Sequence, residues 1–285
     1  MATVVSFVNL SGGAGKTTMT VNLAAYLAGP YGRRVLLIDL DPQASSAAYL
    51  VAQDVWDAQN RAGRTLAQLF RDQMEGKHIF DLDAAILRGV AEVPGLDLLP
   101  SSLSLVDIQD ELSRMPSQVC VDPVKILATS LTEEIRRRYD YVVIDCSHLL
   151  RLLTMNGTIM SDYFVIPVAP DILSNHGIQI TFNRLYWLKG VRHARIEYAG
   201  IIFCKVRPNS FQRRKMAELR ASYSKVYETV LYDRAILSLM AKGNRPLLTA
   251  EALMHRPDWA EVNEVFMACT AEFIAHTGPG EDGRG

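Results

Sequence analysis

Short runs of apolar residues, rich in valine, isoleucine and leucine, recur along the whole chain and constrain its fold more than any other feature. The runs show no alternation of polar and apolar residues, so each is expected to form a strand that is buried on both faces. Segments with helical periodicity lie between them. This order predicts an α/β fold, a doubly wound and mostly parallel sheet with helices on both faces. The expected strands span residues 3–9, 34–39, 96–100, 141–146, 163–168 and 198–206, with a short one within 225–231.

The segments between the strands predict the helices and the extent of the domain. Residues 54–95 are the least regular part and are expected to form short helices at one edge of the sheet. We find no internal repeat and no linker, so residues 1–277 are expected to form a single domain. The tail at residues 278–285, GPGEDGRG, is polar and rich in glycine and proline, and is expected to be disordered. The expected helices span residues 17–28, 103–114, 123–138, 172–189, 209–222 and 258–275.

The composition is that of an ordinary globular protein. Hydrophobic residues make up 49% and charged residues 21% of the 285 residues, and the formal net charge is -1. Any contact with nucleic acid must therefore come from a local basic patch. No apolar run reaches the ~18 residues that a membrane-spanning helix needs, and no secretory leader is recognised. We expect a cytoplasmic protein that does not bind membranes.

A glycine-rich segment follows the first expected strand and precedes the first expected helix. It reads VNLSGGAGKTT at residues 8–18. Its glycines allow backbone N–H groups to turn inward around phosphate oxygens, and the helix N-terminus adds positive potential. Lys16 would reach the β- and γ-phosphates, Thr17 would bind Mg²⁺ and Thr18 would contact the α-phosphate. The segment predicts the phosphate loop of a P-loop NTPase, in which the nucleotide contacts Ser11, Gly12, Gly13, Ala14, Gly15, Lys16, Thr17 and Thr18.

Acidic residues end two further strands of the predicted sheet. LLIDLDPQ at residues 36–43 carries Asp39 and Asp41, and YDYVVIDC at residues 139–146 carries Asp145. A single aspartate at the end of a strand is often only the N-cap of the next helix. Parallel strands, however, deliver these carboxylates to the same edge as the phosphate loop. The arrangement predicts a magnesium site, with Asp145 as the Walker B residue that holds the ion directly or through water.

These motifs, together with SDYFVIPVAPD and VLYDRAILSLMAKGNRP, resemble the ParA/MinD family of deviant Walker A P-loop ATPases. The resemblance covers about residues 3–275 and is nearest to the ParA, or Soj-like, branch. It implies ATP as the nucleotide, dimerisation on binding ATP, and slow hydrolysis. It also implies that Asp41 positions the attacking water and that Asp39 lies near Mg²⁺. The guanine motif N-K-x-D is absent, so GTP is not expected.

The resemblance also suggests where the base binds. In such proteins the adenine pocket follows the strand that is written IIFCKV here. The candidates are residues 205–209, which are Lys205, Val206, Arg207, Pro208 and Asn209.

The phosphate loop departs from the family pattern at one position. The pattern has a lysine where this chain has Ser11. In the family, that lysine crosses the dimer interface to the partner's phosphates. Three hypotheses follow: hydrolysis is very slow or partner-dependent, another cation replaces the lysine, or the protein is an ATP switch with almost no turnover. Arg151 is the leading replacement, although on its own it would be taken for a surface residue of a helix.

A basic segment lies at residues 212–225, which contain five basic residues and one acidic residue. By itself this pattern is also typical of a solvated helix face. In the ParA family, basic residues of this region bind DNA without sequence specificity, so the resemblance favours binding to the nucleoid. The predicted DNA-binding residues are Arg213, Arg214, Lys215, Arg220 and Lys225, which Lys242 and Arg245 would extend.

The resemblance implies a ParA-type ATPase that partitions or positions a plasmid, a chromosome or a large protein cargo. A cargo-bound ParB-like or adaptor protein would stimulate hydrolysis. A carboxysome-positioning branch has serine in place of the same lysine in some members, so a carboxysome or another protein cargo is the first alternative. A nucleotide-gated binding scaffold with negligible turnover is the second.

Overall fold

The computed structural model describes residues 1–114, 122–148, 151–192, 194–243 and 245–278. Seven strands form one sheet in the order β3-β2-β4-β1-β5-β6-β7, and every neighbouring pair is parallel. The predicted α/β fold with a parallel sheet is therefore confirmed, and each strand falls on an apolar run. The predicted disorder of the tail concerns residues that, apart from Gly278, lie outside the described ranges. The strands are β1 Thr3–Phe7, β2 Val35–Leu40, β3 Leu96–Leu99, β4 Tyr141–Cys146, β5 Tyr163–Val168, β6 Glu197–Val206 and β7 Val226–Tyr232.

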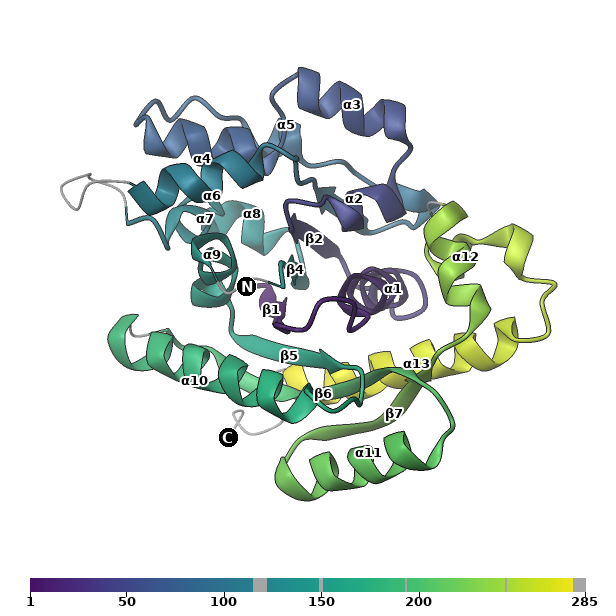
Figure 1. Ribbon diagram of the computed structural model, residues 1–285. Coiled ribbons are helices and arrows are strands. Elements are labelled where there is room, and N and C mark those ends of the chain that lie inside the picture. Colours follow the sequence, from purple (N-terminus) through teal and green to yellow (C-terminus); the bar gives the residue numbers. More distant parts are fainter. Residues whose placement is uncertain (115–121, 149–150, 193, 244, 279–285) are drawn as a thin grey trace, which may run out of the picture.

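Helices cover both faces of the sheet, which explains why the strands are apolar on both sides (Figure 1). One face is covered by helices that share a single apolar cluster, namely α1 Lys16–Ala28, α2 Ser45–Leu50, α12 Ala235–Gly243 and α13 Trp259–Thr277. The opposite face has two clusters. Over β2 and β4 lie α4 Leu66–Met74, α5 Leu82–Ala85, α6 Leu105–Arg114, α7 Ile126–Ser130, α8 Glu133–Arg137 and α9 Leu152–Met160. Over β5 and β6 lie α10 Ser174–Arg192 and α11 Ser210–Ser222.

Short elements complete the chain. The helix α3 spans Gln53–Arg61, and its Trp56 packs against the cluster that contains α1. Single 3-10 turns span η1 Val90–Glu92, η2 Leu247–Thr249 and η3 Glu251–Leu253. No helix of the described ranges is both long enough and apolar enough to cross a membrane.

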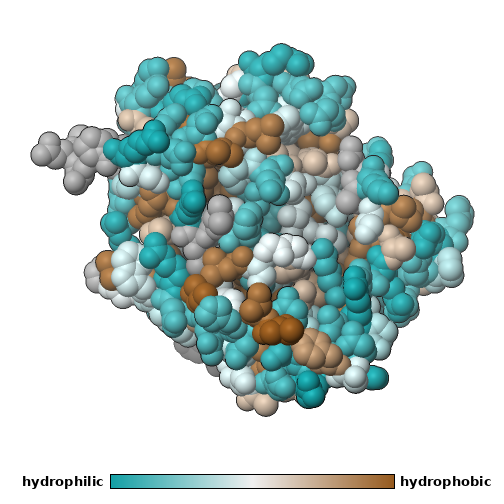
Figure 2. Space-filling view, in the orientation of Figure 1, coloured by the Kyte–Doolittle hydropathy of each residue, from teal (hydrophilic) through white to brown (hydrophobic). Residues whose placement is uncertain are grey.

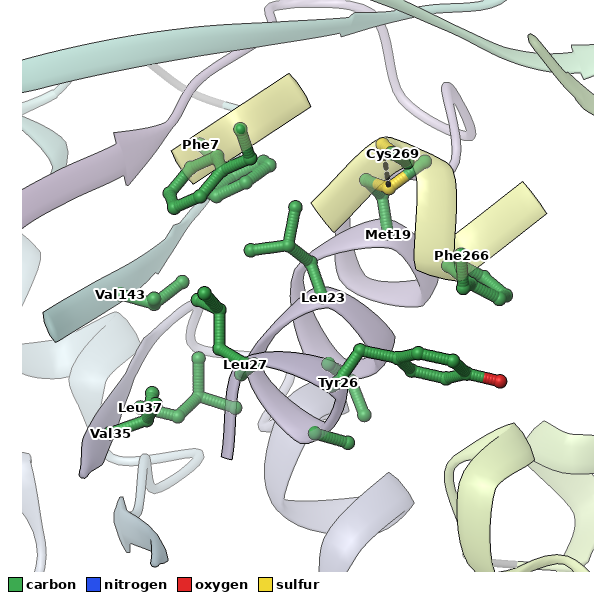
Figure 3. Packing of buried hydrophobic residues seen from close by; sticks show 14 of the residues in the cluster. Phe7, Met19, Leu23, Tyr26, Leu27, Val35, Leu37, Val143, Phe266 and Cys269 are labelled. Atoms are coloured by element: carbon green, nitrogen blue, oxygen red, sulfur yellow. Dashed lines mark hydrogen bonds between the residues drawn. The ribbon is translucent and has the colours of Figure 1, made fainter. Parts of the chain in front are cut away.

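The helix that follows the phosphate loop is buried along most of its length. Leu23 and Leu27 of α1 point into the sheet toward Val143, and Phe266 of α13 packs on the other side of the helix (Figure 3). Tyr26 donates a hydrogen bond of 2.6 Å to Asn263 of α13. Replacing a buried leucine of this kind by alanine costs about 2–5 kcal/mol. The N-terminus of α1 is therefore held firmly at the end of β1.

The structure corrects four helix predictions. Residues 123–138 form two helices, α7 and α8, because the Thr132 hydroxyl accepts a hydrogen bond from the Ile135 N–H and begins a new helix. The helices α2, α9 and α12 were not predicted. In α9 the signal is weak because residues 153–158 are all buried, so no polar face marks the helix.

Candidate nucleotide-binding site

The phosphate loop connects β1 to α1 in the conformation that its glycines allow. Gly13 and Gly15 have φ values of +76° and +84°, in the left-handed region that favours glycine. A β-carbon on Gly15 would also lie 3.1 Å from the Cys204 β-carbon, whereas nothing lies within 4 Å of one on Gly12 or Gly13. Among the described residues, no side chain caps α1. Its first N–H groups are thus available to an anion.

A buried asparagine fixes the start of this loop. The Asn9 side chain accepts a hydrogen bond of 2.8 Å from the Ser11 N–H and donates one to the Pro167 carbonyl of β5. The Ser11 hydroxyl lies 3.2 Å from the position that a β-carbon on Gly177 would occupy, so α10 approaches the loop closely. The sequence analysis did not single out Asn9, although an asparagine between a buried strand and a glycine loop is a usable signal.

Lys16 lies inside the loop, with only 8% of its surface exposed. Its ammonium group donates to the Asn9 carbonyl at 3.4 Å. Burial raises the pKa of Asp145, and the positive charge of Lys16 opposes this rise, so Lys16 lies near the end of β4.

The predicted acidic residues meet at the ends of β2 and β4. Asp39 and Asp145 are direct neighbours in the register of these two strands, and both are fully buried. Asp145 Oδ2 accepts a hydrogen bond of 2.8 Å from the Ser46 hydroxyl. Asp145 Oδ1 is buried and has no hydrogen-bond partner within the described part of the chain. That oxygen points to a ligand that would complete its coordination.

Asp39 and Asp41 are held by the chain that follows β2. Asp39 Oδ2 accepts a hydrogen bond of 2.9 Å from the Ala47 N–H, and Asp39 Oδ1 accepts one of 3.3 Å from the Asp41 N–H. Asp41 is 7% exposed, and its Oδ1 accepts a hydrogen bond of 2.9 Å from the Gln43 N–H. Backbone donors therefore fix the positions of both carboxylates.

Burial makes this group of carboxylates electrostatically unfavourable by itself. Burial, and then the charge of Asp145, raises the pKa of Asp39 well above its ordinary value. Burial also raises the pKa of Asp145, which the charge of Lys16 and the hydroxyls of Ser46 and Thr17 oppose. A divalent cation at this place would offset the repulsion.

The donor set fits Mg²⁺ that is shared with a phosphate ligand. Asp145 Oδ1 lacks a partner among the described residues, and the Thr17 hydroxyl lies close enough to Asp145 to affect its pKa. Within the described ranges, no three or more histidine, cysteine, aspartate or glutamate residues are grouped so that they could hold a metal by themselves. Mg²⁺ usually takes only one or two protein ligands and completes its octahedron with phosphates and water.

Comparisons with known proteins identify the family of this chain. The family model described as an AAA domain matches residues 2–196. The chromosome-partitioning ATPase Soj of Thermus thermophilus is 30% identical over 230 residues, which are 80% of this chain and 80% of the relative. The chain belongs to the ParA/MinD family of P-loop ATPases.

Solved structures share the fold of this ParA/MinD protein. Apo McdA of Cyanothece covers 96% of this chain and 100% of its own, with a TM-score of 0.75 and 18% identity. The cobyrinic acid a,c-diamide synthase of Mycobacterium smegmatis, with an ATP analogue and magnesium bound, has a TM-score of 0.66 and 20% identity. It covers 86% of this chain and 93% of its own. A nucleotide and magnesium thus occur on this fold.

Arg151, the candidate replacement for the family lysine, is exposed at the N-cap of α9. It forms no ion pair with any residue that the structure describes. Residues 149 and 150 of the loop before it lie outside the described ranges. Its charge is directed to solvent and is available to a ligand or a second subunit.

Three of the candidate adenine residues lie on an exposed turn between β6 and α11. Arg207 forms an ion pair of 2.9 Å with Asp233. The Asn209 side chain caps α11, because it accepts a hydrogen bond of 2.8 Å from the Gln212 N–H. Pro208 is exposed between them. Lys205 differs from these three, because it lies within β6 and its γ-carbon is 3.7 Å from the position of a β-carbon on Gly15.

The predicted DNA-binding residues fall into two groups on different faces of the sheet. Those on or next to α11 are Arg213, Arg214, Lys215, Arg220 and Lys225, whereas Lys242 and Arg245 are on or just after α12. Arg220 is anchored, because it donates a hydrogen bond of 2.8 Å to the Tyr227 carbonyl and its guanidinium lies over the Phe203 ring. Arg213 and Arg214 remain largely exposed.

Several of these basic residues also have acidic partners or contacts on the same surface. Lys215 pairs with Glu218 at 2.8 Å, and Arg245 pairs with Glu92 at 2.7 Å. The Lys225 ammonium donates a hydrogen bond of 3.2 Å to the Tyr198 carbonyl.

The contribution of α2 to the site was not predicted. Ser46 holds Asp145, the Ala47 N–H holds Asp39, and the Tyr49 hydroxyl lies 3.1 Å from that of Thr18. All three residues belong to SSAAYL, which follows DLDPQ closely. The available signal was the density of small and hydroxyl residues just after two strand-end carboxylates.

Proposed function

We propose that this protein is an ATP-driven positioning switch of the ParA type. It binds Mg–ATP, dimerises and binds DNA without sequence specificity. When a cargo-bound partner stimulates hydrolysis, the dimer dissociates and releases the DNA. The observation that carries the proposal is the meeting of the uncapped α1 N-terminus, buried Lys16 and the Asp145 oxygen that has no partner among the described residues. A triphosphate with Mg²⁺ satisfies all three at once.

Each residue of the site then has a distinct role. The N–H groups of the loop and Lys16 bind the β- and γ-phosphates, while the Thr17 hydroxyl and Asp145 hold Mg²⁺. A bound Mg²⁺ neutralises charge on the phosphates and orients them for in-line attack. Asp41 lies at the open end of β2 and orients the attacking water. Asp39, fully buried behind it, keeps the backbone of Asp41 in place through their hydrogen bond.

Arg151 is the residue that we assign to the role of the absent lysine. Ser11 has a short neutral side chain next to Gly177, so it cannot neutralise phosphate charge. Arg151 is exposed, follows the Walker B strand and has no competing ion pair among the described residues. In a dimer it would reach the partner's nucleotide. Turnover without a stimulating partner is then slow.

DNA binding is assigned to the group around α11. Arg213 supplies a charge with no ion pair among the described residues, and Arg214 supplies an exposed charge that pairs with Glu218 only at 3.9 Å. Arg220 holds α11 against β6 and β7. Because each phosphate contact releases counterions, binding weakens steeply with salt. Lys242 and Arg245 would contribute only if the DNA also reaches α12.

Calorimetry with Mg–ATP tests the nucleotide site, and ATP turnover with and without DNA tests the switch. Binding with Mg²⁺, an ATP-dependent doubling of the mass in solution, and turnover that DNA or a partner accelerates are the expected results. Tight ATP binding with no turnover under any of these conditions would instead indicate the nucleotide-gated scaffold.

A protein cargo such as a carboxysome is the second candidate function. Ser11 favours it, because a carboxysome-positioning branch of the family has serine at the same position in some members. Identification of the protein that accelerates ATP turnover separates this candidate from plasmid or chromosome partitioning.

A further inference from the structure

Lys205, near the end of β6, lies beside the phosphate loop. Its γ-carbon is 3.7 Å from the position that a β-carbon on Gly15 would occupy. The side chain is exposed, and its ammonium group has no hydrogen bond or ion pair with any residue of the described ranges. Because the side chain extends beyond this carbon to its ammonium group, the charge is free to reach an anion held by the loop.

The strand directs Lys205 to this place by breaking its own alternation. Ile202 and Cys204 pack in the cluster that contains α1, while Phe203 and Val206 pack in the cluster on the opposite face. Strict alternation would point Lys205 to the Phe203 side, away from the phosphate loop. Its γ-carbon instead lies next to Gly15.

A β-bulge produces this change of direction. Phe203 pairs with Val230 and Val206 with Tyr232, so β6 uses one residue more than β7 over the same stretch. Lys205 lies within this irregular stretch and has a φ of +51°. The left-handed conformation is unfavourable for a residue with a long side chain. Bulges of this kind re-aim side chains next to functional sites.

We propose that Lys205 binds the phosphates of the nucleotide from within the same subunit. The inference rests on the proposed function, since it requires that the loop binds a nucleotide. It assigns to β6 a second cation, in addition to Lys16, that neutralises phosphate charge in the bound state. Arg151 would act on hydrolysis in the dimer, whereas Lys205 acts on affinity in the monomer. The chain would thus compensate in part for Ser11 without help from a partner.

Calorimetric titration of Mg–ADP into Lys205→Gln tests the proposal. Glutamine keeps most of the length and removes the charge, and we expect affinity for ADP to fall about tenfold, as for the loss of a hydrogen bond to a charged group. Lys205→Arg is expected to bind as the wild type does. Lys77→Gln is the matched control, because Lys77 is an exposed lysine whose ammonium pairs only with Glu75 among the described residues. At about 0.5 M salt the difference between wild type and Lys205→Gln is expected to shrink.

A second variant separates this role from a structural one. Lys205→Gly relieves the left-handed strain, so its melting temperature is expected to equal or exceed that of the wild type while ADP affinity falls. If wild type binds ADP and Lys205→Gln binds within about twofold of it, the inference is wrong and the proposed function stands. If wild type itself binds neither ADP nor ATP with Mg²⁺, the proposed function fails first.

Discussion

The two halves of the sheet's carboxyl edge differ in what they offer a ligand. Where β2 and β4 end, the carboxylates are buried and held by backbone N–H groups and the Ser46 hydroxyl. Where β5 and β6 end, the side chains are exposed: Ile172 and Leu173 are 78% and 67% accessible, and Lys205 has no ion pair within the described ranges. Figure 2 shows hydrophobic surface in the region where Figure 1 places the start of α10.

This difference separates two kinds of task. The buried acidic half is fixed before any ligand arrives, which is what positioning a metal and a water requires. The exposed half can adapt to something that comes from outside the subunit. Substitutions in the first half should therefore change rates, and those in the second half should change affinities.

The strongest challenge to this division is Arg151, which is exposed but follows the acidic strand β4. Arg151→Ala is expected to lower ATP turnover by about 10³–10⁵-fold, as for the loss of an arginine finger, while ATP binding to the monomer is unchanged. Steady-state phosphate release and calorimetry measure the two effects. Arg137→Ala, which removes an exposed arginine paired with Glu133, is the control. Unchanged turnover in the Arg151 variant would remove this residue from the mechanism.

Asp41→Asn tests the buried half directly. Loss of the carboxylate that orients water is expected to slow turnover by about 10²–10⁴-fold, while ATP affinity stays within a few-fold of wild type. The side-chain oxygen of the introduced asparagine can still accept from the Gln43 N–H, so the local fold is retained. A variant that hydrolyses ATP normally would show that the water is positioned elsewhere.

Replacing both Arg213 and Arg214 by alanine tests the exposed half. The affinity for double-stranded DNA is expected to fall about tenfold or more at low salt, and the slope of log affinity against log salt to decrease by about 2. Fluorescence anisotropy at several salt concentrations measures both quantities. Turnover without DNA should not change. The double variant Lys77→Ala and Arg137→Ala removes the same charge from another surface, and an equal loss of DNA binding there would contradict the assignment.

The smallest expected effect concerns stability. Burial raises the pKa of Asp145 in the folded state, so folding is most favoured below the unfolded pKa of about 4 and loses stability as the pH rises through the folded pKa. Asp145→Asn removes this penalty. It should be about 1 kcal/mol more stable than wild type near pH ~8, and the difference should shrink toward pH ~4.

Urea unfolding of the nucleotide-free proteins at several pH values measures this difference. The same variant should lose the extra stability that Mg²⁺ adds to the ADP complex of the wild type. A variant that is less stable than wild type at every pH would show that Asp145 supports the apo fold rather than a ligand.

Sequence reasoning was successful where one residue type dictates local geometry. The apolar runs predicted every strand of the described sheet, and Gly13 and Gly15 adopt the left-handed conformations that the phosphate loop needs. It could not foresee that α2 would hold Asp39 and Asp145, because these contacts depend on how residues 44–50 turn back over the sheet. The direction of Lys205 was equally hidden, since it arises from a bulge between β6 and β7. The sequence shows at Ser11 that the family lysine is absent, but it does not show which cation, if any, replaces that lysine.

The contact between α9 and the sheet has a consequence for evolution. A methyl group on Gly157 would come within 3.0 Å of Leu40, 3.2 Å of Ile144 and 3.3 Å of Cys146. These neighbours adjoin Asp39, Asp41 and Asp145 in the chain. Among descendants of this sequence, a larger residue at position 157 requires these neighbours to shift, so such a change should be found together with smaller side chains at one of the three positions.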